Sequence, residues 1–414
     1  MPKLPLDGIK VCDFTWVWAG PYCTLQLAHL GAEVVRIETK TRPCVTRMLP
    51  PWPGGVFNGL NKSGYFNQYN QGKKSIALNF KHPEAREAAW RLVKRSDVVV
   101  NNFAAGVIEK LGFGYDLVRK ANPNVVMISL TGYGDTGPYK DYVAYGPAQV
   151  PLSGLSALTG FPGMPPMHAG FSYADPNAGI HAAFAVITAL FHRAKTGEGQ
   201  YIDMSQWECA MDLLAEGILE YTMNNREPER TGNRDPQMAP HGIFKCLDLP
   251  EKILDMTIDQ FVAIVCIDDA EWGRLARAIG KPELADDSRF KTFAARKHNE
   301  AALEEIIGQW TQVKRVADVV AMLQGAGVSA TACADNKYLA EDPHLNERGY
   351  FVELEHPEVG VKQHCGIPWK MSGTPCAVKT AAPLLGQHTD EVLTGLLGYS
   401  DAEVAAMRAK GALE

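Results

Sequence analysis

Residues 6–38, LDGIKVCDFTWVWAGPYCTLQLAHLGAEVVRIE, decide the fold, because they predict a strand, a helix and a second strand in succession. The strands are expected at residues 8–14 and 32–38, and the helix at residues 21–30. Two parallel strands in one sheet need a crossover connection, which is usually a helix. This stretch therefore predicts a β–α–β unit at the start of the chain.

The same alternation continues through the next hundred residues. Further strands are expected at residues 75–80, 97–101 and 124–130, with an amphipathic helix at residues 83–95. The last two strands contain the continuous apolar runs VVV and VVMI, which are typical of strands buried on both faces. We therefore expect a large, doubly wound, Rossmann-like α/β domain with a parallel sheet.

Two long stretches interrupt this pattern. Residues 39–72 and 132–170 are rich in Gly and Pro, and irregular loops of such length are uncommon unless they serve a function. A strong helix is expected at residues 175–195, followed by a short strand at residues 200–204. Both irregular stretches are thus candidates for a functional site.

The second half of the chain predicts a smaller unit. We expect the large domain to span residues 1–223, a linker residues 224–240, a small α+β domain residues 241–335 and a C-terminal segment residues 336–414. The small domain is expected to contain two strands and three helices, at 242–246, 260–267, 270–279, 300–311 and 315–324. The chain is expected to be irregular from residue 350, with a last helix at residues 401–410.

The composition excludes several classes of protein. The 414 residues are 46% hydrophobic and 21% charged, which is typical of a globular protein, and the formal net charge of -6 argues against a nucleic-acid partner. No apolar run approaches the ~20 residues of a membrane span, and no signal-peptide core follows the N-terminus. The 9 Cys have no metal-binding spacing, and most stand in apolar surroundings, as buried free thiols do, which predicts a protein of the reducing cytoplasm. We expect neither a metal nor a permanently bound cofactor.

Asp175 precedes Pro176 at the start of the predicted helix. An Asp followed by a Pro is typical of an N-cap and the first helical residue. The helix N-terminus also favours the charged carboxylate, so we expect this Asp to be ionised at neutral pH. An ionised carboxylate in a fixed position is also a suitable nucleophile. The residues alone leave both roles open.

Small residues follow the first strand, where ligands bind in open α/β sheets. No GxGxxG motif is present, so a dinucleotide site is not indicated, and Gly20-Pro21 fits an ordinary turn equally well. Several lysines flank the early strands and are either phosphate contacts or solvated side chains: Lys40, Lys73, Lys74, Lys81 and Lys110. The histidines have no metal spacing, and His241 stands apart only because it ends the predicted linker.

Seven segments together resemble the family III CoA-transferases, the CaiB–BaiF family. They occur in the same order as in that family and cover nearly the whole chain. The segments are residues 6–38, 70–86, 96–115, 124–145, 171–205, 342–360 and 382–393.

This resemblance implies an interlocked-ring dimer whose C-terminal segment returns to the large domain. It also implies that coenzyme A (CoA) or acyl-CoA is the substrate and that Asp175 is the catalytic nucleophile. The matching CoA-binding positions are Val17, Ala19, Lys40, Leu78, Asn79, Lys81, Asn102, Phe103, Ala104, Lys110 and Tyr145. We expect CoA to move from a donor such as succinyl-CoA to an acid through an aspartyl-CoA thioester, in a homodimer or a heterodimer with a paralogous subunit.

Three departures from the formyl-CoA transferases bear on the substrate. Trp18 stands where they carry Gln. Thr39 stands where they carry Arg, although Lys40 of this chain can substitute for that Arg. Their glycine-rich flap has no counterpart before His241. These differences argue against oxalate and formyl-CoA as substrates. Trp18, Tyr145 and His241 are the expected substrate pocket. Trp18 and the loop that contains Trp, Pro and Met favour a larger, partly apolar acid. The chain as a whole most resembles the transferases of aromatic acids such as benzylsuccinate.

Two alternatives stay open. An α-methylacyl-CoA racemase has a similar fold and pairs an Asp with a His, but Tyr145 stands at the position of that His. A neutral tyrosine, with an ordinary pKa near 10, is a poor general base, so transfer is favoured over racemisation. The second alternative is a CoA-binding subunit of a heteromeric transferase.

Overall fold

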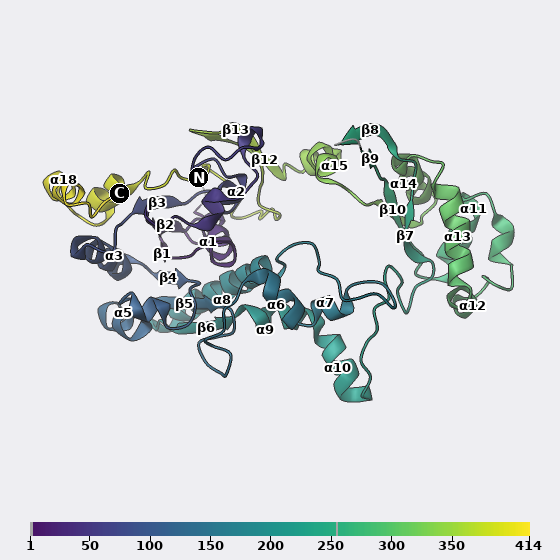
Figure 1. The fold of residues 1–414 in the computed structure, drawn as a ribbon, viewed down its shortest axis with the longest axis horizontal. Coiled ribbons are helices and arrows are strands. Elements are labelled where there is room, and N and C mark those ends of the chain that lie inside the picture. Colours follow the sequence, from purple (N-terminus) through teal and green to yellow (C-terminus); the bar gives the residue numbers. More distant parts are fainter. Residues whose placement is uncertain (1–2, 254–255) are drawn as a thin grey trace. The chain divides into compact units, whose positions relative to one another are not determined.

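The computed structural model describes residues 3–253 and 256–414. Two compact units make up the chain. The first comprises Met1–Ala157, His168–Glu227 and His344–Glu414, and the second comprises Leu158–Met167 and Pro228–Pro343. Most elements of both units are labelled in Figure 1.

A six-stranded parallel sheet forms the centre of the first unit (Figure 1). Its strands are β1 (Lys10–Asp13), β2 (Glu33–Glu38), β3 (Lys74–Ala77), β4 (Val98–Asn101), β5 (Val126–Thr131) and β6 (Tyr201–Ser205). The order across the sheet is β3-β2-β1-β4-β5-β6, so the direction of winding reverses between β1 and β4. This order is that of the doubly wound Rossmann sheet, and it confirms the predicted α/β class.

Helices cover both faces of this sheet. On one face, α1 (Ala19–His29) and α8 (Ala174–Thr196) bury Val11, Val98 and Val126 in one apolar cluster. On the other face, α3 (Pro83–Arg95) and α5 (Tyr115–Ala121) cover the neighbouring strand residues, such as Val99 and Met127. Successive strand residues point to opposite faces, which explains why the strands read as continuous apolar runs.

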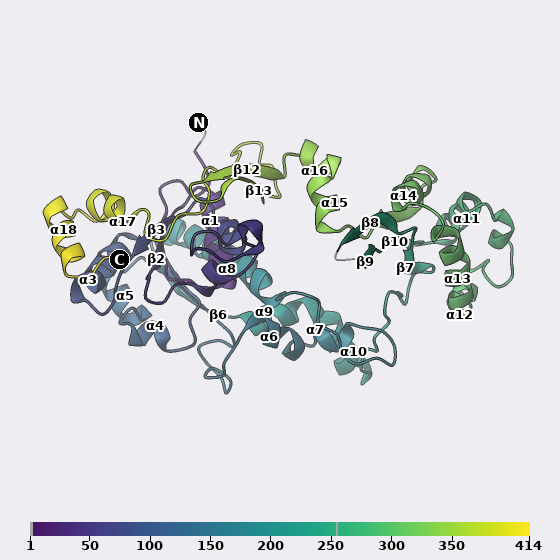
Figure 2. The ribbon, with the colours of Figure 1, turned by 45° about the horizontal axis from the view of Figure 1, so that its top comes forward.

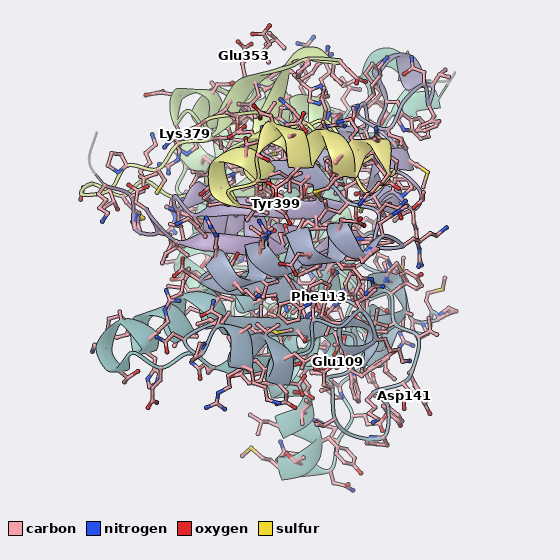
Figure 3. The ribbon with its side chains drawn as sticks, turned by 90° about the vertical axis from the view of Figure 1, so that its left-hand side faces the viewer. Glu109, Phe113, Asp141, Glu353, Lys379 and Tyr399 are labelled. Carbon is pink, nitrogen blue, oxygen red and sulfur yellow. The ribbon has the colours of Figure 1, made fainter. Side chains whose placement is uncertain are left out.

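The C-terminal segment packs on the first unit. It forms a hairpin of β12 (Phe351–His356) and β13 (Gly360–Cys365), then α17 (Thr389–Glu391), a π-helix (Val392–Leu396) and α18 (Asp401–Ala409). The backbone N–H of His388 donates to Ser75 O at 2.9 Å, which places α17 beside β3 (Figure 2). Tyr399 and Phe113 belong to one buried cluster (Figure 3).

The hairpin corrects the prediction that the chain is irregular from residue 350. Residues 351–356, FVELEH, alternate apolar and charged side chains, and the turn Pro357–Val359 precedes Gly360 with φ +74°. Alternation with a turn is a hairpin signal. The many charged residues of this exposed hairpin concealed the signal.

Short helices also occupy the stretches that were expected to be irregular. The first contains two 3-10 turns, Val45–Met48 and Pro53–Gly55, and α2 (Gly64–Tyr69), whose N-cap Ser63 accepts from Phe66 N. The second contains α6 (Gly146–Leu152) and α7 (Leu155–Leu158). Further short elements lie outside both stretches: α4 (Val107–Lys110), α9 (Gln206–Met211), the 3-10 turn Asp212–Leu214 and α10 (Ala215–Asn224).

The second unit is built on a three-stranded antiparallel sheet of order β11-β10-β7. Trp272 is fully buried in its core. The strands are β7 (His241–Lys245), β10 (Phe261–Val265) and β11 (Ser329–Ala332), beside a hairpin of β8 (Leu249–Ile253) and β9 (Met256–Ile258). The helices are α11 (Asp269–Ala278), the 3-10 turn Pro282–Ala285, α12 (Phe293–His298), α13 (Glu300–Thr311), α14 (Val316–Gly325) and α15 (Asn336–Glu341), and α16 (Pro343–Glu347) begins where the chain leaves this unit.

None of the helices in the described part of the chain combines the length and the apolar character that crossing a bilayer requires.

Candidate active site

A cleft of about 1070 Å³ opens in the first unit where the sheet reverses its winding. Its walls are the residues that follow β1, β2, β3 and β4, together with the loop before α6 and the start of α8. Ligands of open α/β sheets bind at this switch point, outside the carboxyl ends of the strands. We call this cavity the switch-point cleft.

The loop after β1 is held firmly in place. Asp13 is fully buried and its carboxylate accepts from the backbone N–H of Thr15 at 2.8 Å and from Thr24 Oγ1 at 2.7 Å. The side chain of Asn102, after β4, donates to Trp16 O at 2.8 Å and accepts from Trp16 N at 2.7 Å. These bonds join the ends of the two strands that flank the switch point.

Asp175 lies in the wall of this cleft, in the first turn of α8, and is only 8% exposed. Burial raises the pKa of its carboxyl from 3.8 to about 6, although the N–H of Ala19 donates to the carboxylate and opposes the rise. Because this value is still below 7, most of the carboxylate is ionised at neutral pH. A desolvated carboxylate that keeps its charge is well suited to nucleophilic attack.

The structure corrects the prediction that Asp175 caps the helix. Tyr173 is the N-cap residue, the helix begins at Ala174, and no side chain caps it. The N–H of Asp175 donates to Ser172 O at 3.0 Å, so the chain already turns as a helix one residue before the expected start. Pro176 is compatible with this position because the first turn needs no N–H donor there. The carboxylate is therefore free of a capping role.

Aromatic side chains lie close to Asp175. Tyr65 lines the cleft, and burial together with the charge of Asp175 raises the pKa of its phenol. The ring of Trp18 packs against it: the distance between ring centroids is 5.5 Å for Trp18 and Tyr65 and 5.2 Å for Trp18 and Tyr69. Trp18 itself does not line the cleft, so its contribution to the pocket is to support Tyr65.

Most of the CoA-binding positions implied by the resemblance meet in the switch-point cleft. The lining includes Val17, Leu78, Asn79, Lys81, Asn102, Phe103, Ala104 and Tyr145, together with Asp175. These residues come from five separate segments of the sequence. The cleft is therefore large enough and correctly placed for an extended ligand that reaches Asp175.

The other predicted residues lie outside the lining. Ala19 is fully buried and meets Asp175 through its N–H. The backbone N–H of Lys40 donates to the side chain of Glu414, and Lys110 is exposed on α4. His241 belongs to β7 of the second unit, where its Nδ1 lies 2.7 Å from Asn233 O.

Two of the lysines that the sequence leaves as either phosphate contacts or solvated side chains form contacts inside the protein instead. Lys73 is buried, and its Nζ lies 3.5 Å from Asp13 and donates to Pro21 O at 2.9 Å. Burial lowers the pKa of Lys73 to about 7. Lys74 forms ion pairs with Glu33 at 2.9 Å and Glu391 at 2.7 Å. Both amines already have partners inside the protein.

Sequence reasoning did not identify several residues of the cleft. Arg42 places its guanidinium 5.2 Å from the ring centroid of Trp16, and both residues line the cleft. Arg86 donates to Phe80 O at 2.8 Å and to Leu111 O at 2.9 Å, which fixes another wall. Arg42 and Tyr65 belong to the long irregular stretch 39–72, whose length was the available signal.

Within residues 3–253 and 256–414, no group of three or more His, Cys, Asp or Glu side chains is arranged to hold a metal ion.

Comparison with known proteins agrees with this geometry. Residues 6–389 match the family model described as CoA-transferase family III. A succinyl-CoA–D-citramalate CoA-transferase of Chloroflexus aurantiacus is 33% identical, over 99% of this chain and 98% of the relative. The beta subunit of a succinyl-CoA–L-malate CoA-transferase of the same organism is 32% identical, over 98% of both chains.

Two further proteins extend the similarity. A formyl-CoA:oxalate CoA-transferase of Streptomyces avermitilis is 32% identical, over 99% of each chain. The crystal structure of a CAIB/BAIF family protein from Brucella suis superposes with a TM-score of 0.84 at 31% identity, over 96% of this chain and 100% of that one. The chain therefore belongs to CoA-transferase family III.

Proposed function

We propose that this protein transfers CoA from an acyl-CoA donor to a carboxylic acid, with Asp175 as the nucleophile. The observation that carries the proposal is the buried carboxylate of Asp175 in the wall of the switch-point cleft, with a pKa of about 6. Such a group is charged at neutral pH but poorly solvated. Family membership adds that the enzyme is a CoA-transferase.

The cleft suits CoA along its whole length. Lys81 and Arg42 line it and supply positive charge for the phosphates of CoA. Val17, Asn102 and Ala104 line the same cleft and offer backbone and small side chains for a thin pantetheine arm. In this placement the thioester of an acyl-CoA reaches Asp175.

The first half of the reaction loads CoA onto the enzyme. The Asp175 carboxylate attacks the thioester carbonyl of the donor, and the C–S bond breaks to give a mixed anhydride and CoA thiolate. The thiolate then attacks the aspartyl carbonyl, which releases the donor acid and leaves an aspartyl-CoA thioester. Covalent catalysis of this kind divides one difficult exchange into easier steps.

The second half reverses these events with the acceptor. The acceptor carboxylate attacks the aspartyl thioester and forms a new anhydride with release of CoA thiolate. The thiolate attacks the acceptor carbonyl, and Asp175 returns as a carboxylate. Backbone N–H groups near the start of α8 are suited to stabilise the oxyanions, and exclusion of water protects the anhydride from hydrolysis.

The lining near Asp175 favours an acceptor with an apolar or aromatic part, such as benzylsuccinate, with succinyl-CoA as donor. Val45, Leu49, Tyr65 and Tyr145 contribute apolar surface to the cleft. The pKa of Asp175 is set by burial and by the N–H of Ala19. We expect aromatic acids to be used faster than oxalate, malate or glutarate. A preference for small hydrophilic diacids would refute this assignment.

We also propose that the first unit pairs with a second subunit, as an interlocked-ring dimer. One face of α8 exposes apolar side chains that a lone subunit would leave in water: Ile180, Phe184 and Phe191. A homodimer is the simplest assembly. The relative that is named a beta subunit supports a heterodimer as the second candidate. Native mass spectrometry of the protein purified alone distinguishes a dimer from a monomer that awaits another chain.

Free cysteines support a reducing compartment. All nine, from Cys12 to Cys376, are free thiols. We therefore propose a cytoplasmic location.

The direct test of the function is the exchange activity of Asp175→Asn and Asp175→Ala. Both variants should lose transfer from succinyl-CoA to candidate acids while retaining CoA binding, measured by calorimetry. Near-normal turnover in either variant would contradict the proposal. Incubation of the wild type with an acyl-CoA in deuterated water, without an acceptor acid, tests the racemase alternative, because a racemase would exchange the α-proton.

A further inference from the structure

We propose that Cys44 is a positioning residue for the reaction: its sulfur fixes the turn at Val17 and thereby aims the Ala19 N–H at Asp175. This inference rests on the proposed role of Asp175 as nucleophile. Cys44 is buried, 2% exposed, and the lining of the switch-point cleft contains its neighbour Val45 but not Cys44 itself.

The turn at Val17 is unusual. Its φ angle is +62°, in the left-handed region that a β-branched residue rarely adopts. A conformation of this kind persists only where the surroundings impose it. Val17 also lines the cleft, as does its neighbour Trp16. The structure must therefore contain a group that holds this turn.

Cys44 supplies that group. The backbone N–H of Val17 donates to Cys44 Sγ at 3.2 Å. Cys44 Sγ also lies 3.1 Å from Thr46 Oγ1. The sulfur thus connects the strained turn after β1 to the 3-10 turn that begins at Val45.

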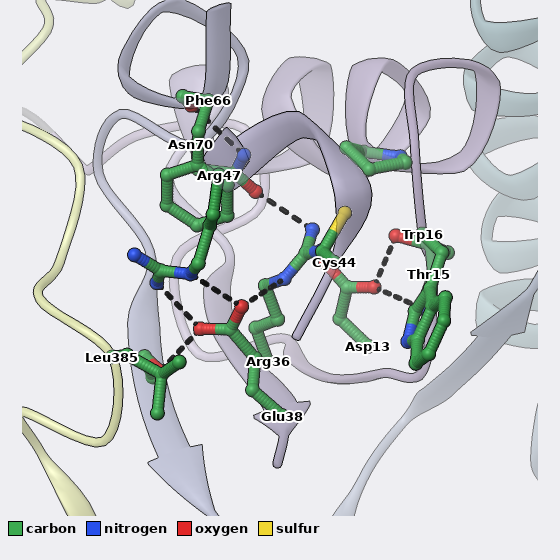
Figure 4. Close-up of polar contacts among 12 residues, drawn as sticks. Asp13, Thr15, Trp16, Arg36, Glu38, Cys44, Arg47, Phe66, Asn70 and Leu385 are labelled. Atoms are coloured by element: carbon green, nitrogen blue, oxygen red, sulfur yellow. Dashed lines mark hydrogen bonds and ion pairs between the residues drawn. The ribbon is translucent and has the colours of Figure 1, made fainter. Parts of the chain in front are cut away.

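A buried guanidinium stands beside the same sulfur. Arg36, on β2, is fully buried, and its pKa is raised because contacts with Cys44, Glu38 and Asp13 outweigh the effect of burial. Arg36 donates to Asn70 Oδ1 at 2.9 Å and lies 3.4 Å from Glu38 (Figure 4). The guanidinium is held from two sides, so the sulfur beside it has little freedom to move.

The turn leads directly to the nucleophile. Ala19 follows Val17 by two residues, and its N–H donates to Asp175 and lowers the pKa of that carboxyl. If the acceptor at Cys44 is removed, Val17 can relax toward an unstrained backbone and rotate the following peptides. Asp175 would then lose part of its only described hydrogen bond from this loop and become less acidic.

The titratable groups beside this arrangement come from β1, β2 and α2. Asp13 at the end of β1 and Glu38 at the end of β2 both act on Arg36. Tyr65, on α2, faces both Asp175 and Cys44, and Arg36, on β2, faces Cys44. Both remain in place in a Cys44 variant. A shift in the pH dependence of the reaction therefore reports the loop between Val17 and Ala19.

The test compares Cys44→Ala, which removes the acceptor, with Cys44→Ser, which keeps one. Cys12→Ala is the matched control, because Cys12 is also fully buried in the first unit but belongs to the apolar cluster on β1. In Cys44→Ala, kcat should fall about tenfold, as for one weakened hydrogen bond to a charged group. Its acidic limb should move to higher pH, while Cys44→Ser stays near the wild type.

The design separates this inference from the proposed function. Labelling of the Asp175 peptide in the wild type with an acyl-CoA establishes the nucleophile first; if no label forms, both claims fail. If the label forms but Cys44→Ala keeps the pH profile and the kcat of Cys12→Ala, the positioning role is wrong and the nucleophile stands. Melting curves of all three variants show which of them are folded at the assay temperature. If Cys44→Ala fails to fold, Cys44→Ser is the deciding variant. Its pH profile must then match that of the wild type, and a displaced profile overturns the inference.

Discussion

Gly146 makes room for the carboxylate of Asp175. A Cβ atom at position 146 would lie 1.7 Å from Asp175 Oδ2 and 2.9 Å from Ser172 Cβ. Gly146 opens α6, next to Tyr145 in the wall of the cleft. The backbone at the start of α6 thus limits where the carboxylate of Asp175 can lie.

Replacement of Gly146 by Ala should therefore displace the nucleophile. The new methyl group forces the flexible carboxylate to rotate rather than the backbone to shift, so we expect at least about a hundredfold loss of kcat with little change in stability. Gly395→Ala is the matched control, because no atom lies within 4 Å of the Cβ position there. Steady-state kinetics decide the matter: equal activity of the two variants would show that Asp175 tolerates another position.

The rate should depend on pH through Asp175. Only the carboxylate form attacks, and burial raises its pKa to about 6. The rate should therefore fall about tenfold for each pH unit below 6 and be level from pH 7 to 8. A profile of kcat/KM between pH 4.5 and 8 tests this. A plateau that extends down to pH 4.5 would mean that the essential carboxyl is not buried as described.

The same burial destabilises the folded protein at neutral pH, because the pKa of this carboxyl is 3.8 in the unfolded chain and about 6 in the folded protein. The folded state binds the proton more tightly. The stability that this proton contributes is therefore fully present below pH 3.8 and is lost as the pH rises through 6. The difference corresponds to about 3 kcal/mol. Asp175→Asn should gain up to that amount at pH 7.5 and nothing at pH 3.5.

Urea unfolding of Asp175→Asn and the wild type measures this gain. Asp116→Asn serves as the control, since Asp116 is exposed in the first turn of α5 and its replacement should change the free energy of unfolding by less than about 0.5 kcal/mol. An Asp175→Asn variant that is less stable than the wild type at pH 7.5 would argue against a raised pKa.

The resemblance assigns both Lys81 and Lys110 to CoA binding, but the cleft includes only Lys81. Lys81 lines the cleft, whereas Lys110 is exposed on α4 outside the lining. Lys81→Ala should weaken CoA binding about fivefold at low salt and less at high salt, because the contact is electrostatic and exposed. Lys110→Ala should bind CoA nearly as the wild type does. Calorimetric titration with CoA checks both, and a larger effect at Lys110 would place the phosphates elsewhere.

Much of the first unit is predictable from the sequence, since its strands are apolar runs and its helices carry clear periodicity. The helix Pro83–Arg95 is found at the predicted bounds, and the strand Val98–Asn101 differs by one residue. The sequence predicts an ionised Asp175, and its pKa of about 6 agrees with that prediction. The position of Asp175 inside the first turn of α8 is not predictable from the sequence, because the chain already turns at Ser172, whose O accepts from the N–H of Asp175.

The rest of the site depends on contacts between distant segments. Lys73 and Lys81 look alike in the sequence, but only the fold buries Lys73 against Asp13. The contact of Gly146 with Asp175 joins the first turns of α6 and α8, and no local pattern contains it. The left-handed turn at Val17 is hidden as well, since a β-branched residue is the last that propensity would place there.

The central claim is that Asp175 carries CoA during turnover. The most direct measurement is mass spectrometry of the protease-digested enzyme after brief incubation with succinyl-CoA. The account predicts that the peptide containing Asp175 gains the mass of CoA less one water, and that the adduct disappears when an acceptor acid is added. An unmodified Asp175 peptide in an enzyme that is turning over, or an adduct that persists in Asp175→Asn, would contradict it.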